Sequence, residues 1–333
     1  MRTTPRRPLD IEAAFPELAE YRATATRLHP RPGCPGETVS SVGGKFLWPA
    51  AEAWPVCREA HPKGRGQLLQ NVRKRRQLLT EVRRRPGGPT PEERELLISL
   101  RKRRRYDPDL ADTAAIPLLP VAQLYTRDVP DLTGPEDMDL LQVFWCPFDA
   151  HGERRTVAVH LVWRRAGDVV EPMTESPQPV VVGNDGYVPE PCVLNPERVV
   201  EHQDIELLPE SLQERLEEWE ATLEERHVGE GVPLAYGSDF SVAPGWKVGG
   251  FAAWNLTGPA EPTCACGAPM VLLLNVHSRE WDGGNHSWVP VEDRPFMDDR
   301  GASTPTGIVV GTNALRIFQC SADPTHAHQV NEQ

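Results

Sequence analysis

The residues of this chain best suited to chemistry are cysteines and histidines that fall into two sets with similar spacing. In each set, two potential ligands lie in an early segment and the others follow an apolar, strand-like segment. The first set is Cys57, His61, Cys146 and His151, and the second is Cys264, Cys266 and Cys320 with either His326 or His328. Thiolate and imidazole ligands in groups of four are typical of structural zinc sites and favour Zn²⁺ over Mg²⁺ or Ca²⁺. We therefore predict structural zinc, most clearly in the tighter second set.

A simpler interpretation of the same residues needs no metal. Cys146 and Cys320 each end an apolar segment, where a cysteine can serve as a small buried hydrophobic residue. The histidines would then be surface residues. If the metal is bound, four protein ligands leave no open coordination position, so neither site is expected to be catalytic.

Motifs of the common enzyme classes are missing from the sequence. Gly43-Gly44-Lys45 does not form a phosphate-binding loop, because Val39 stands where a glycine is needed and Phe46 replaces Ser or Thr. The chain contains neither a Gly-x-Ser-x-Gly nucleophile motif nor a His-Glu-x-x-His motif. No catalytic residues are predicted.

The elements that must position the two sets are themselves repeated. Gly43-Gly44 is followed by Trp48, and Gly249-Gly250 is followed by Trp254. Residues 117–128 align with residues 269–280 without gaps, and each copy closes on an apolar segment that ends in cysteine, at 141–146 and 315–320. A repeated order of this kind predicts a duplicated supersecondary unit. The glycine pairs are expected to be structural, at turns or bulges with positive φ.

These motifs resemble known families. The Gly-Gly and Trp-Pro segment, residues 118–124 and residues 141–146 are similar to the YwqG-like domain family, and the second copy is also similar to the programmed cell death protein 2 family. The latter resemblance implies a chaperone for a ribosomal protein. The sequence departs from that family at Asn275, at the Cys264-x-Cys266 spacing and in a long basic insertion.

The pattern of elements predicts an α+β fold of mostly antiparallel strands, with two pseudo-symmetric halves and a helical-hairpin insertion. We expect an N-terminal arm at 1–37 with a short helix within 12–27, and a first half at 38–165 interrupted by the insertion at 58–112. A linker at 166–238 should contain an acidic amphipathic helix at about 209–226, and the second half covers 239–333. In the insertion, Thr90, Pro91 and Glu93 predict the start of a helix. Because the second half has no equivalent segment, residues 66–105 are expected to be dispensable for the shared core.

Charge is strongly segregated along the chain. The formal net charge is −12, yet residues 58–105 contain 16 Lys or Arg and 5 Asp or Glu. This local charge of +11 leaves −23 for the remainder and indicates an ionic partner, or neutralisation of one part of the chain by another. The predicted partner-binding residues are Arg73, Lys74, Arg75, Arg76, Arg101, Lys102, Arg103 and Arg104. Non-specific nucleic-acid binding through the hairpin is one alternative, but aromatic residues for base stacking are almost absent.

These observations favour a cytoplasmic, non-enzymatic protein-binding or chaperone-like protein. No apolar segment approaches the roughly 20 residues of a membrane helix, and no secretion signal is evident. Two other function classes remain open. One is an immunity or toxin-neutralising protein whose acidic body covers a basic partner, and the other is an enzyme whose site is assembled from residues far apart in sequence.

Overall fold

Six strands form the first sheet, in the order β2, β11, β3, β7, β8, β9, and every pair is antiparallel. The computed structural model describes residues 2–101, 110–149, 151–152, 156–226, 233–254, 258–281 and 286–333. The strands of this sheet are β2 Arg31–Pro32, β3 Ser41–Val42, β7 Leu119–Tyr125, β8 Leu140–Trp145, β9 Val159–Arg164 and β11 Cys192–Val193. The long strands β7 and β8 are buried throughout, and β8 contains the strand-forming residues Val143, Phe144 and Trp145.

The second sheet also has six antiparallel strands, in the order β12, β1, β13, β14, β15, β16. They are β1 Arg22–Arg27, β12 Glu197–His202, β13 Lys247–Gly249, β14 Met270–His277, β15 Ala314–Cys320 and β16 Gln329–Glu332. Two short ribbons complete the strands: β5 Gln67–Leu68 pairs with β10 Val181–Val182, and β4 Val56–Cys57 pairs with β6 Ile116–Pro117.

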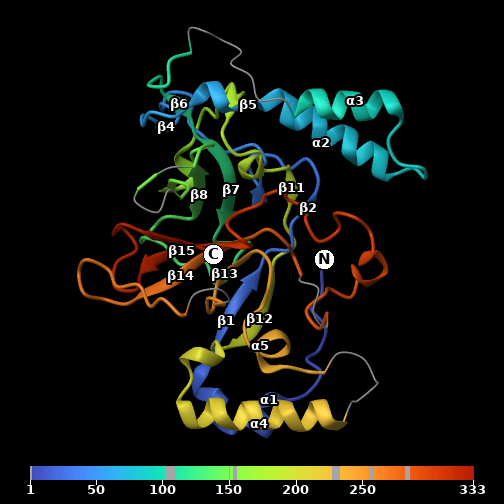
Figure 1. The fold of residues 1–333 in the computed structure, drawn as a ribbon. Coiled ribbons are helices and arrows are strands. Elements are labelled where there is room, and N and C mark those ends of the chain that lie inside the picture. Colours follow the sequence, from blue (N-terminus) through green and yellow to red (C-terminus); the bar gives the residue numbers. More distant parts are fainter. Residues whose placement is uncertain are drawn as a thin grey trace.

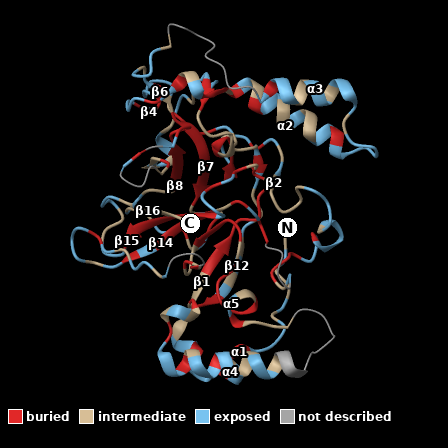
Figure 2. Ribbon diagram, in the orientation of Figure 1, coloured by how far each residue is buried: buried red, intermediate tan, exposed pale blue. Residues whose placement is uncertain are grey.

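The two sheets pack on each other through one hydrophobic core. That core combines Val121 and Val143 of the first sheet with Val248, Leu274 and Ile317 of the second. In Figure 1, β7 and β8 run up the view while β14 and β15 run across it, so the strands of the two sheets cross. Buried residues are concentrated in these strands (Figure 2). The predicted α+β class with mostly antiparallel strands is confirmed.

The sheets share a sequence of features that matches the repeat predicted above. Each has a short strand that leads into a glycine pair, a long central strand, a closing strand and a final edge strand. The long strands carry an irregularity in register at equivalent places, between Pro120 and Ala122 in β7 and between Leu272 and Leu274 in β14. The duplication itself stays a prediction, which these features support.

The N-terminal segment is a structural part of the second sheet, so the prediction of an arm at 1–37 was wrong. After α1 (Ile11–Ala14), β1 pairs with β12 on one side and with β13 on the other. The short helix expected within residues 12–27 corresponds to α1 and a 3-10 helix at Pro16–Tyr21, whereas residues 22–27 form the strand β1. The alternating residues of Arg-Ala-Thr-Ala-Thr-Arg suit a strand, and tertiary pairing outweighed the weak helical pattern. The region described as a linker likewise supplies β12 to this sheet.

The basic insertion forms the expected helical hairpin of α2 (Leu69–Arg83) and α3 (Pro91–Leu100). Thr90 caps α3, and Glu93 completes the capping box, as predicted. However, Leu69 and Val72 belong to the main core. Since a deletion from residue 66 would remove β5 and both of these side chains, the expectation that the core does not need residues 66–105 is corrected.

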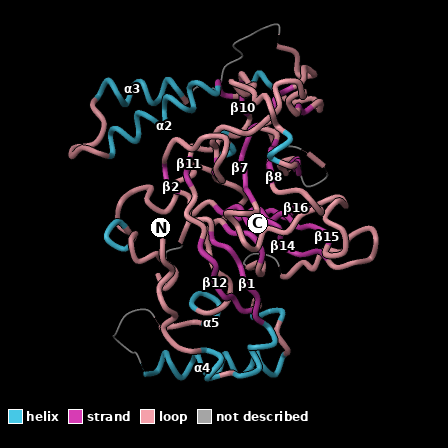
Figure 3. The backbone as a smooth tube through the Cα atoms, turned by 180° about the vertical axis from the view of Figure 1, so that it is seen from behind, coloured by secondary structure: helices cyan, strands magenta, loops and turns pink. Residues whose placement is uncertain are grey.

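The acidic helix α4 (Glu210–Arg226) lies at the opposite end of the molecule from the hairpin (Figures 1 and 3). It buries Leu212 and Leu216 against Phe15 and against Tyr236 of the short helix α5 (Tyr236–Asp239). The helix therefore packs on the N-terminal segment. The neutralisation of the basic hairpin by another part of the chain, which the charge pattern left open, does not come from this helix (Figure 1).

Candidate metal centres

The first cysteine and histidine set comes together in a buried cluster at one end of the first sheet. Cys57 ends the short strand β4, His61 follows it in the chain, and Cys146 comes directly after β8. His151 lies in an isolated bridge with Thr156. One ligand atom from each of the four residues lies within 4.8 Å of the others, and all four residues are buried.

The second set forms an equivalent cluster at the end of the second sheet. Cys264 and Cys266 sit in a tight turn that Gly267 closes with a positive φ of 88°, and the Gly267 amide donates to the Cys264 carbonyl. Cys320 ends β15, and a turn at Asp323 brings His326 back toward it. The ligand atoms of Cys264, Cys266, Cys320 and His326 also lie within 4.8 Å of one another.

Separations between the ligand atoms suit a tetrahedral metal ion. In the first cluster, Nε2 of His61 is 3.3 Å from Sγ of Cys57 and 3.4 Å from Sγ of Cys146. A tetrahedral ion with bonds of about 2.3 Å to sulfur and about 2.0 Å to nitrogen places these atoms about 3.5 Å apart, and two sulfurs about 3.8 Å apart. Both clusters could therefore hold a metal ion.

The second cluster shows the same geometry. Sγ of Cys264 lies 3.5 Å from Nδ1 of His326, and Sγ of Cys266 lies 3.6 Å from Sγ of Cys320. The latter separation is far longer than the roughly 2.05 Å of a disulfide bond. All seven cysteines are free thiols, so the pair is better arranged as two metal ligands.

The prediction left either His326 or His328 as the fourth ligand of the second cluster, and the structure brings only His326 to it. Nε2 of His328 lies 3.2 Å from the Val159 carbonyl, on the first sheet. Two cysteines lie outside both clusters. Cys34 is exposed, and Cys192 is buried with its Sγ 3.4 Å from the Pro305 carbonyl.

The pKa shifts within the clusters differ from one ligand to the next. Burial, together with the neighbouring His151 and Lys63, lowers the pKa of His61, so the imidazole is neutral and able to bind a metal. Burial raises the pKa of Cys146 well above its usual range, which a bound dication would reverse by stabilising the thiolate. Burial also acts to raise the pKa of Cys320. Hydrogen bonds from the Asp323 backbone and from His326 outweigh it and lower this pKa to about 6.

One residue near the first cluster has no signal in the sequence. Oε2 of Glu59 lies 3.0 Å from Nδ1 of His151. A carboxylate beside the second nitrogen of a metal-bound histidine commonly fixes the ring orientation. Glu59 lies in a loop between two ligands, Cys57 and His61, and only the fold shows that it reaches His151.

The glycine pairs have the structural role predicted for them. Gly43, Gly249 and Gly250 have positive φ. The segment after each pair accepts hydrogen bonds from polar side chains of its own sheet. In the first sheet, Gln142 donates through Nε2 to the Leu47 carbonyl at 2.9 Å.

The second sheet repeats this contact, since Arg316 donates to the Ala253 carbonyl, and it adds a buried ion pair. Nζ of Lys247 donates to the Phe251 carbonyl at 2.7 Å and to Oε1 of Glu201 at 2.6 Å. Lys247 and Glu201 are both fully buried, and burial lowers the pKa of Lys247 while Glu201 raises it. These side chains hold the chain that leads toward the second cluster.

Several predicted partner-binding residues of the hairpin bind the protein itself. Arg75 forms an ion pair with Asp185, and Arg73 donates through Nη2 to Oε1 of Gln178 at 2.7 Å. Arg76 anchors α2 to the body by donating hydrogen bonds to three backbone carbonyls and the Glu190 carboxylate. Lys74 and Arg101 are exposed, whereas Lys102, Arg103 and Arg104 lie outside the described residues. The basic surface available to a partner is therefore smaller than predicted.

Comparison with known proteins gave no assignment. No protein-family model matches the chain, and a search of curated proteins found no match. The resemblances noted from the sequence stay predictions. No helix in the described part of the chain is long and apolar enough to cross a membrane.

Proposed function

We propose that this chain is a non-enzymatic, cytoplasmic protein-binding protein of the YwqG-like type, chaperone-like in action, whose two halves are each held together by a structural zinc ion. The observation that supports this most directly is the pair of four-ligand clusters with tetrahedral separations. In each cluster, cysteine and histidine account for all four ligands, a set that suits Zn²⁺.

The positions of the clusters support a structural role. Each links an early loop to the chain beyond the closing strand of its sheet, Cys146 in the first and Cys320 in the second. Four protein ligands leave no position for water or substrate, so the ions would stabilise the fold without catalysing a reaction. A protein-binding role accords with this arrangement and with the segregated charge of the chain, −23 outside residues 58–105.

Two experiments test the two parts of the proposal separately. Elemental analysis of protein made without a metal-binding tag, after zinc-supplemented expression, should find about two equivalents of zinc per chain. Less than about a tenth of an equivalent would overturn the metal assignment. Affinity purification from native extract, followed by mass spectrometry, should recover a defined protein partner. If the same preparation converted a substrate only when zinc was bound, the protein would instead be an enzyme.

A further inference from the structure

The last strand of the first sheet, β9, has an open edge. Ala158 and Arg164 face β8, since their carbonyls accept hydrogen bonds from Cys146 and Asp139. Backbone groups of alternate residues in a strand point to opposite edges, so those of Val159, Leu161 and Trp163 point away from β8.

Among the residues that the structure describes, only the first of these three positions has a hydrogen-bond partner. The Val159 carbonyl lies 3.2 Å from Nε2 of His328. In the described part of the chain, the backbone amides and carbonyls of Leu161 and Trp163 have no hydrogen-bond partner. The sequence Val-His-Leu-Val-Trp-Arg of β9 is well suited to pairing and contains no proline or lysine to protect the edge.

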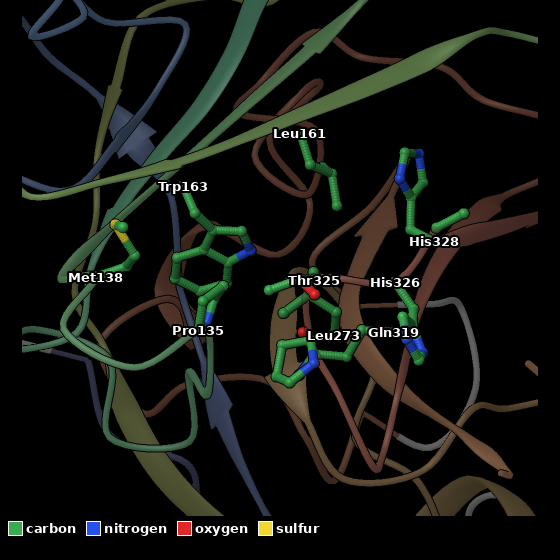
Figure 4. A pocket seen from close by; sticks show the side chains of 11 residues that line it. Pro135, Met138, Leu161, Trp163, Leu273, Gln319, Thr325, His326 and His328 are labelled. Carbon is green, nitrogen blue, oxygen red and sulfur yellow. The ribbon is translucent and has the colours of Figure 1, made fainter. Parts of the chain in front are cut away.

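A cavity of about 370 Å³ lies beside this open edge, between the two halves of the protein. Figure 4 shows Trp163, Met138 and Pro135 on one side of it and Gln319, His326 and His328 on the other. The cavity wall is mainly apolar. Leu161 and Trp163 project their side chains into it, and the same residues present the unpaired backbone groups.

The cavity also contains a hydrogen-bond acceptor. Oε1 of Gln319 is buried and has no partner among the described residues. This atom suits a ligand that donates a hydrogen bond, as a backbone amide does.

We propose that an extended peptide segment of a partner protein adds to the open edge of β9 and places one large apolar side chain in this cavity. This inference rests on the proposed protein-binding function. An extended chain is the ligand whose alternating amides and carbonyls match a strand edge, and pockets beside the edge then select alternate side chains. Because the chain outside residues 58–105 carries a charge of −23, the segment is expected to have basic residues beside its apolar ones.

The edge can be blocked without breaking the sheet. In Leu161→Pro, the lost amide is one that points away from β8, so the pairing of β8 with β9 is retained. Leu161→Ala keeps the amide and shortens one side chain of the cavity wall. Val200→Ala is the control, since Val200 is an exposed residue on β12, the edge strand of the other sheet.

The probe is a library of random peptides of about twelve residues displayed on phage, selected on zinc-loaded full-length protein. Selected peptides should alternate apolar residues and carry Lys or Arg. Their affinity should fall at least about tenfold in Leu161→Pro, fall less in Leu161→Ala and stay unchanged in Val200→Ala. Hydrogen exchange on the wild-type protein should show slower exchange of the Leu161 and Trp163 amides when peptide is bound, a result that does not depend on the folding of any variant.

Three results would overturn the proposal: no selected peptide binds, bound peptides leave both amides exchanging as before, or Leu161→Pro binds them as tightly as the wild type. A wild-type dimer that Leu161→Pro dissociates would also overturn it, because the occupant would then be a second copy of this chain. The function proposed above fails differently, through missing zinc or a missing partner in native extract.

Discussion

At the scale of single residues, the separation of two sulfur atoms distinguishes the two roles that a cysteine pair can have. Sγ of Cys266 and Sγ of Cys320 are 3.6 Å apart, which matches one edge of a tetrahedral site and not a covalent bond. His326 completes the cluster and His328 faces the other sheet. The second cluster is therefore defined by four side chains, two from the turn at Cys264, one from the end of β15 and one from the turn that follows it.

Removal of one ligand should remove one zinc ion. We expect Cys146→Ser and Cys320→Ser each to reduce bound zinc from about two equivalents to about one, and to lower the free energy of unfolding by several kcal/mol, because metal binding and folding are coupled. Cys34→Ser is the control, since Cys34 is exposed and lies outside both clusters. Elemental analysis and urea unfolding measure both effects. Unchanged zinc content in both cluster variants would show that these cysteines are small core residues and not metal ligands.

Two glycines with nearly equal φ allow backbone strain to be separated from crowding. Gly250 (φ 68°) would place a Cβ atom 2.3 Å from Oε2 of Glu201 and 2.8 Å from Cβ of Ala25, whereas Gly88 (φ 69°) has no atom within 4 Å of that position. We expect Gly88→Ala to cost about 1 kcal/mol from backbone strain alone. Gly250→Ala should cost about 3 kcal/mol, since overpacking adds to the strain. Denaturant unfolding measures both variants. Equal decreases in the free energy of unfolding would show that crowding at Gly250 contributes nothing.

At the scale of elements, the two clusters differ in how far solvent can reach them. All four residues of the first cluster are buried, whereas Cys266 and His326 of the second are exposed. A chelator or an oxidant should therefore reach the second ion first. We expect one zinc equivalent to be released quickly by a colorimetric chelator, or by hydrogen peroxide at low concentration, and the other much more slowly.

The variants identify which ion leaves. In Cys320→Ser the fast phase should be missing, while in Cys146→Ser it should remain. A single release rate for both ions would contradict the difference in exposure.

One arginine of the basic hairpin makes four contacts with the body of the protein. Nη1 of Arg76 donates to the Val188 carbonyl and to Glu190, and Nη2 donates to the carbonyls of Asp185 and Gly307. These acceptors lie in both the middle and the last part of the chain, so the arginine links three segments.

We expect Arg76→Ala to lower the free energy of unfolding by about 2–3 kcal/mol, because three carbonyls and a carboxylate lose a charged donor. Lys74→Ala, on the exposed side of the same helix, should change it by less than about 0.5 kcal/mol. Equilibrium unfolding in urea compares the two. If both variants were equally stable, the contacts of Arg76 would add nothing to those of Arg75, Leu69 and Val72.

At the scale of the whole molecule, the two sheets share one core, and the second sheet takes two strands from outside residues 239–333. The second sheet needs β1 and β12, which come from residues 22–27 and 197–202, and one core includes side chains of both sheets. Removal of either sheet would expose the apolar face of the other. The halves should therefore unfold together.

This shared core predicts one cooperative unfolding transition for the zinc-loaded protein, with coincident tryptophan fluorescence and circular dichroism curves. A fragment of residues 239–333 lacks β1 and β12 and leaves β13 as an unpaired edge, so we expect it to be unfolded or insoluble even with zinc. Two separate transitions, or a folded fragment with native-like chemical shifts, would show that the halves are independent.

Local patterns in the sequence were enough for several elements and for both clusters. The capping box at Thr90 and Glu93, the spacing of Leu212, Leu216 and Trp219 by four and three residues, and the β-branched segment of β9 each depend on neighbours within a few residues. Such short-range signals can be detected in one sequence. The repeat aligned the cysteines, and their chemistry then indicated the metal.

What the sequence determined by itself is the class of fold and the membership of the two ligand sets, apart from the choice between His326 and His328. That choice, the entry of β1 into the second sheet, the binding of Arg75 and Arg76 to their own chain, and the open edge at Leu161 and Trp163 were decided only by the tertiary structure. The physical reason is that these features depend on contacts between residues far apart in the sequence, 62 positions for Cys264 and His326 and 110 for Arg75 and Asp185. Propensity, spacing and charge act locally and carry no information about which distant segment will be the partner.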